Sequence, residues 1–72
     1  MEVKIMVIGP GLKREIIGES LFDCIEVAYR KFRGNRVELI GLNPLGYIDD
    51  QELFVDQEYL DRESLKEIIG SI

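Results

Sequence analysis

The sequence contains no histidine, no tryptophan, one cysteine and two prolines. Without histidine it lacks the commonest general base at neutral pH and a common zinc and copper ligand, so we expect neither a transition-metal site nor a cofactor. A single cysteine, Cys24, cannot form a disulfide within the chain, which favours a reducing compartment. No apolar run approaches the roughly 18 residues of a membrane span, and the apolar run before Gly9 is too short for a signal peptide. We therefore expect a cytoplasmic protein.

The chain has 72 residues, of which 46% are apolar and 32% charged, and this favours one small folded domain. Its charge is unevenly distributed: residues 1–48 hold seven basic and six acidic side chains, whereas residues 49–72 hold two basic and eight acidic ones. An acidic surface repels phosphate backbones, so nucleic acid is not an expected partner. A basic protein is a candidate partner for the acidic last third.

Two segments begin the predicted fold. Residues 3–8 are apolar and largely β-branched and stop at Gly9-Pro10-Gly11, which is typical of a strand followed by a turn. Residues 12–32 then show the apolar spacing of an amphipathic helix. Gly18 leaves two helix starts open, at Leu12 or near Ser20, and we adopt the earlier one.

The rest of the chain predicts three further strands and a last helix. Residues 36–42 form a second strand, which makes a βαβ unit with two parallel strands. Residues 45–48 and 53–55 flank a polar turn and should pair as an antiparallel hairpin. Asp61 then caps a helix whose apolar stripe is Leu65, Ile68, Ile69 and Ile72. The predicted fold is α/β in the order β-α-β-β-β-α, with a mixed four-stranded sheet and two helices on one face.

Several segments in this order resemble the small thioredoxin- and glutaredoxin-like redox proteins. Residues 3–11 resemble the opening strand and turn of that family, Pro44 its later proline, residues 47–50 its hairpin and residues 62–69 its last helix. The resemblance implies a single truncated thioredoxin-like domain over residues 1–72.

Two departures limit what the resemblance implies. Leu12 and Glu15 stand where the family has the cysteines of Cys-x-x-Cys, so disulfide exchange of the thioredoxin kind should be absent. The helix that normally precedes the proline is reduced to residues 41–43, and that helix covers one face of the sheet in the family.

A face of the predicted sheet is therefore left uncovered, although its strands are apolar on both sides. The side chains expected there are Met6, Ile8, Ile40 and Leu42. Burying about 400 Å² of such surface contributes on the order of 10 kcal/mol before the cost of association. We expect a homodimer, or an equivalent partner, to cover this face.

Two local motifs are candidate sites. Cys24 lies on the apolar stripe of the first helix, so a buried side chain is favoured over a reactive thiol. Backbone amides of Gly9 and Gly11, at the start of that helix, together with Lys13 and Arg14, could bind a small anion. The glycine spacing of a dinucleotide or phosphate loop is missing, so a solvated turn is favoured over that site.

These observations predict a function without catalysis. The first hypothesis is a thioredoxin-like interaction module that dimerises through the uncovered sheet face. The alternatives are a thiol-dependent redox protein that acts through Cys24, and a small-anion or nucleotide-binding regulator that uses residues 9–14.

Overall fold

The computed structural model describes residues 1–70 and contains five strands and two helices in that range. The elements in chain order are β1 (Val3–Gly9), β2 (Leu12–Gly18), α1 (Leu21–Phe32), β3 (Asn35–Ile40), β4 (Pro44–Asp50), β5 (Glu52–Val55) and α2 (Arg62–Gly70). Neither helix is long and apolar enough to cross a membrane.

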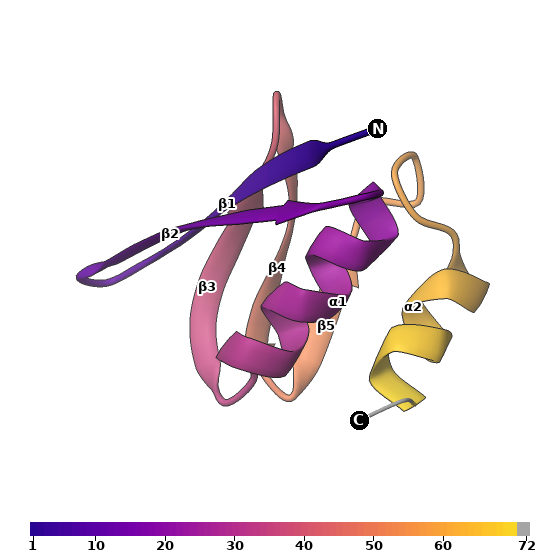
Figure 1. Ribbon diagram of the computed structural model, residues 1–72. Coiled ribbons are helices and arrows are strands. Elements are labelled where there is room, and N and C mark those ends of the chain that lie inside the picture. Colours follow the sequence, from indigo (N-terminus) through magenta and orange to yellow (C-terminus); the bar gives the residue numbers. More distant parts are fainter. Residues whose placement is uncertain (71–72) are drawn as a thin grey trace.

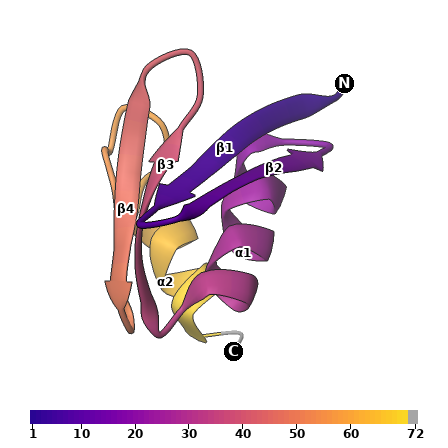
Figure 2. The ribbon, with the colours of Figure 1, turned by 90° about the vertical axis from the view of Figure 1, so that its left-hand side faces the viewer.

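The strands form one antiparallel sheet in the order β2-β1-β3-β4-β5. Because β1 lies between β2 and β3 and is antiparallel to both, the two strands joined through α1 run in the same direction without pairing. Both helices pack on one face of the sheet, so the molecule has two layers (Figures 1 and 2).

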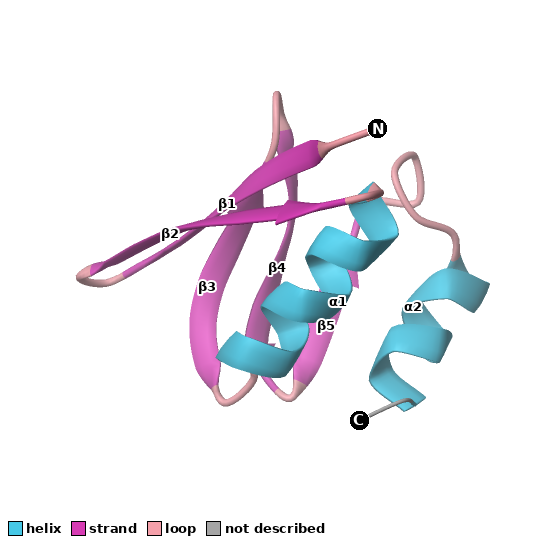
Figure 3. Ribbon diagram, in the orientation of Figure 1, coloured by secondary structure: helices cyan, strands magenta, loops and turns pink. Residues whose placement is uncertain are grey.

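The segment of residues 12–18 is a strand, which corrects the predicted helix start at Leu12 (Figure 3). Gly11 has a φ of 67°, which suits the tight turn that folds β2 back onto β1. All seven residues of β2 pair with β1, so this ladder overrides the local helical pattern. The helix starts at the later alternative, where the Ser20 side chain accepts a hydrogen bond from the Asp23 amide over 3.1 Å.

This strand changes the topology. The predicted four-stranded mixed sheet, its β-α-β-β-β-α order and its parallel βαβ unit are wrong, because the additional strand reverses the chain before α1. The predicted truncated thioredoxin-like fold is therefore wrong as well, since it assumed that topology. The α/β class remains, with two helices.

The hairpin expected around residues 49–52 is present as antiparallel β4 and β5. Its turn is tighter than predicted, and Asp50 adopts a φ of 56° there. Pro44 begins β4, a strand position that proline tolerates, and all peptide bonds of the described residues are trans. The last helix is also present, with Ile68 buried, whereas Ile72 of its predicted stripe lies outside the described residues.

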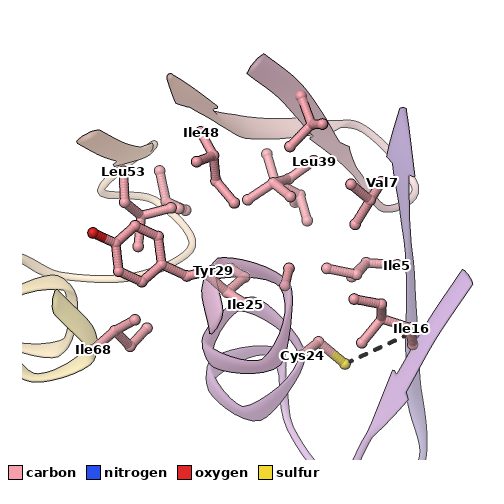
Figure 4. Packing of buried hydrophobic residues seen from close by; sticks show 14 of the residues in the cluster. Ile5, Val7, Ile16, Cys24, Ile25, Tyr29, Leu39, Ile48, Leu53 and Ile68 are labelled. Atoms are coloured by element: carbon pink, nitrogen blue, oxygen red, sulfur yellow. Dashed lines mark hydrogen bonds between the residues drawn. The ribbon is translucent and has the colours of Figure 1, made fainter. Parts of the chain in front are cut away.

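The core lies between the sheet and the helices (Figure 4). Ile5 and Val7 of β1, with Leu39 of β3, are buried against α1, which contributes Ile25. The remaining buried apolar side chains are Ile16, Cys24, Ala28, Tyr29, Val37, Leu45, Ile48, Leu53, Val55, Leu60 and Ile68. The Tyr29 hydroxyl donates a hydrogen bond to the Gln51 carbonyl over 2.7 Å and ties α1 to the β4–β5 turn. The buried side chains thus form one core between the sheet and the helices.

Candidate functional site

The face of the sheet that points away from both helices is here called the open face. Successive side chains of a strand point to opposite faces, so the residues that alternate with the buried ones belong to it. They are Lys13, Glu15 and Ile17 of β2, Lys4, Met6 and Ile8 of β1, Arg36, Glu38 and Ile40 of β3, Pro44, Tyr47 and Asp49 of β4, and Glu52 and Phe54 of β5. No described helix covers this face (Figure 2).

Three of the four predicted dimer-face residues come together on the open face. Met6 and Ile40 are directly paired across β1 and β3, and Ile8 follows on the same side of β1. All three are partly buried by their neighbours. Leu42 is fully exposed but lies in the loop between β3 and β4, off the sheet, so the strand predicted to extend to it ends earlier.

An aromatic pair extends this apolar surface toward the β5 edge. Tyr47 and Phe54 are paired across β4 and β5, with stacked rings whose centroids are 5.4 Å apart and whose planes differ by 25°. Tyr47 remains 45% exposed and Phe54 52% exposed. Large aromatic side chains left in water beside other apolar groups are characteristic of protein-binding surfaces.

The open face is also hollowed on both sides of Glu38. One shallow pocket of about 350 Å³ lies toward β5 and is lined by Glu38, Ile40, Pro44, Tyr47 and Phe54 among others. A second, of about 320 Å³, lies toward β1 and is lined by Ile8, Pro10, Arg36 and Glu38 among others. The surface therefore has depressions that side chains of a partner can fill.

Five of the seven charged side chains on the open face fall into two groups, and the other two are Lys13 and Glu38. Lys4 and Glu15 form an ion pair with 3.6 Å between nitrogen and oxygen. At the end of the sheet that holds the β4–β5 turn, Arg36, Asp49 and Glu52 lie side by side on β3, β4 and β5. Asp49 and Glu52 are directly paired like charges, an unfavourable arrangement in an isolated chain.

Cys24 is buried among core residues and lies on the helix side of the sheet (Figure 4). Its Sγ lies 3.3 Å from the Val3 carbonyl oxygen and 3.9 Å from that of Ile16, with geometry that suits donation by the thiol. Burial raises the pKa of this thiol, and the nearby carboxylate of Asp23 adds to the effect. Because the thiolate is the nucleophile, these surroundings suit a structural thiol better than a reactive one.

The proposed anion site has a different setting from the one expected. Gly9 and Gly11 flank the turn of the β1–β2 hairpin, and the first helix begins only at Leu21, so the amides of a helix N-terminus are not beside them. Lys13 and Arg14 are consecutive strand residues, whose side chains point to opposite faces. The helix N-terminus that the prediction assumed is therefore not at this turn, and anion binding by these four residues stays a prediction.

Other charged groups are dispersed. Among residues 1–70, no three histidine, cysteine, aspartate or glutamate side chains gather closely enough to hold a metal ion. The acidic side chains from Asp49 onward are spread over the β4–β5 hairpin, the loop after it and α2. The basic protein predicted as their partner stays a prediction.

Tyr47 and Phe54 are the surface residues that sequence reasoning missed. Each alternates with core residues in its strand, Tyr47 before Ile48 and Phe54 between Leu53 and Val55. This alternation indicates that they point away from the core. Their stacking depends on the hairpin register, which is set by where the turn is centred.

No protein-family model, no curated protein and no solved structure matches this chain. The resemblance to thioredoxin-like proteins thus stays a prediction, and the geometry of the open face is the basis on which a function can be argued.

Proposed function

We propose that this protein is a non-catalytic interaction module that forms a homodimer through the open face of its sheet. The observation that carries the proposal is the exposed, stacked pair of Tyr47 and Phe54 on the same face as the apolar Ile8 and Ile40, a face that no described helix covers. As part of the same proposal, the module acts in the cytoplasm, where its single buried thiol remains reduced.

The size of the open face supports a dimer of modest affinity. The five strands hold 31 residues, which at about 3.3 Å per residue and about 4.8 Å between strands cover roughly 490 Å² in projection, and side chains standing above the sheet enlarge that area. Specific interfaces start near 600 Å² from each partner. A second copy that covers most of this face therefore forms an interface at the small end of this range.

The residue types on the open face support binding. Its polar side chains are dispersed carboxylates and cations, with no histidine, cysteine, serine or threonine among them. Its aromatic and aliphatic side chains instead resemble the centre of an interface, where a few such residues supply most of the affinity.

The proposal is tested by measuring the mass in solution by light scattering over a wide range of concentrations. We expect a species of twice the 8.3 kDa chain mass at high concentration, which dissociates on dilution. Phe54→Ser should weaken association about tenfold or more, since it removes one ring of the exposed aromatic pair.

The matched control is Val27→Ser, which removes an exposed apolar side chain from α1 rather than from the open face. This variant should associate like the wild type. A wild-type protein that stays monomeric at every concentration overturns the proposal. So does a dimer that reducing agent dissociates, because such a dimer would depend on Cys24 and not on the sheet.

A further inference from the structure

Building on the proposed dimer, we propose the orientation of its two copies: the sheets stack face to face about a two-fold axis that runs parallel to the strands and passes between β3 and β4. In this arrangement β3 of one copy lies over β4 of its partner, and β1 lies over the partner's β5. The inference rests on the charge pattern and register of the open face.

The charges at the turn end of the open face select this axis. Arg36 on β3 and Asp49 on β4 lie at the same height along the strands, because they are directly paired in the sheet. A two-fold axis midway between these strands places Arg36 over the partner's Asp49. By symmetry the partner's Arg36 lies over Asp49 of the first copy, so the dimer contains two such pairs. Each Asp49, which lies between the like charge of Glu52 and Arg36 of its own chain, thereby gains a second cation from the partner.

The next positions along the strands are also compatible. Glu38 and Tyr47 are paired at one height, so the axis places the Glu38 carboxylate near the hydroxyl of the partner's Tyr47, which can donate a hydrogen bond. At the same height Ile8 lies over the partner's Phe54, which brings apolar side chains together near the two hollows of the face. These central groups of the face are thus matched by a single operation, and β2, at the edge of the sheet, lies outside the contact.

Other two-fold axes match this face less well. An axis parallel to the strands but centred on β3 places Glu38 over the partner's Glu38 and Arg36 over the partner's Arg36, and like charges facing each other oppose association. An axis perpendicular to the strands lays the turn end of one sheet over the opposite end of the other. In that case Arg36 and Asp49 do not meet across the interface.

The orientation is tested by exchanging the two charges between chains. Arg36→Asp and Asp49→Arg are prepared as separate proteins, and their masses are measured alone and as an equal mixture. Each variant alone should associate about tenfold or more weakly than the wild type, because both cross-chain pairs then carry like charges. The mixture should regain the dimer, because each new side chain meets an opposite charge on the other variant.

Arg30→Asp is the control, since it makes the same charge change on the exposed side of α1. Circular dichroism and thermal unfolding of each variant establish that it is folded. A wild-type dimer whose association neither variant weakens, or a mixture that stays monomeric, overturns the orientation while the open-face dimer stands. A wild-type monomer overturns the proposed function and this orientation together.

Discussion

Cys24 illustrates how one side chain fits its surroundings. It is completely buried beside Ile16, and an added Cβ at Gly18 would lie 3.1 Å from its sulfur, so the space around the thiol is filled. A thiol in such a place behaves as a small apolar group with a weak hydrogen-bond donor.

We expect the native thiol to react slowly. A thiol reagent should label Cys24 in the folded protein about 100-fold or more slowly than in the urea-unfolded protein, because reaction needs both an opening of the structure and loss of a tightly held proton. Following the labelling by absorbance under both conditions provides the measurement. Equal rates in both states would revive the redox alternative.

Gly46 is a second residue at which local geometry decides stability. A Cβ at this position would collide with the backbone carbonyl of Phe54 on the neighbouring strand. No side-chain rotation can relieve this clash, because the atom that is met belongs to the backbone. We expect Gly46→Ala to lower the free energy of unfolding by about 3 kcal/mol, measured by urea denaturation. Gly70→Ala is the control, because a Cβ there meets nothing within 4 Å. A Gly46 variant as stable as this control would contradict the predicted clash.

At the level of elements, the helix starts are determined by short side chains rather than by apolar periodicity. Ser20 caps α1, and the Asp61 carboxylate accepts a hydrogen bond of 2.8 Å from the Ser64 amide at the start of α2. The helical spacing of residues 12–18 is overridden by a strand ladder because β1 and the glycine turn bring a pairing partner close along the chain. The apolar periodicity of residues 12–18 alone does not show that a strand is preferred to a helix there.

The cap of α2 should make stability depend on acidity. The Ser64 amide and hydroxyl hold the pKa of Asp61 below its ordinary value of 3.8. A carboxyl whose pKa is lowered by folding contributes stability above the ordinary value, and that contribution is lost as the pH falls through the folded-state pKa. The comparison is with Asp61→Asn, whose side-chain amide can still cap the helix. Urea denaturation should show that the difference in free energy of unfolding between the wild type and this variant becomes smaller as the pH falls. An advantage unchanged with pH would argue against this role.

At the scale of the whole molecule, the two-layer architecture leaves half of the sheet surface in solvent. A chain of 72 residues buries a smaller part of its surface than a large domain does, and it is correspondingly marginal in stability. A second copy on the open face adds buried surface that the chain alone does not provide.

The thermal midpoint should therefore rise with protein concentration. Association stabilises the folded state by mass action, because the unfolded chain has no open face to pair. Differential scanning calorimetry at several protein concentrations measures this midpoint. The midpoint of the Phe54→Ser variant should change less with concentration than that of the wild type. A wild-type midpoint independent of concentration would count against a dimer coupled to folding.

Part of the fold could be predicted because it depends on local chemistry. The apolar run before Gly9, the hairpin that contains Asp50 and the cap at Asp61 are each specified by neighbouring residues, and all three are present. The burial of Cys24 likewise follows from its place on an apolar stripe.

The remaining features depend on which strands pair and in which register, and the local patterns along the chain leave both open. Residues 12–18 became a strand by pairing with β1, and this one change turned a parallel unit into an antiparallel sheet. The same pairing determined which residues lie side by side on the open face, including Arg36 with Asp49 and Tyr47 with Phe54. Alternation, caps and turns follow from neighbouring residues. The order and register of the strands, and with them the candidate interface, were settled only when the whole sheet formed around one core, because a shift of one residue in register moves every side chain of a strand to the other face.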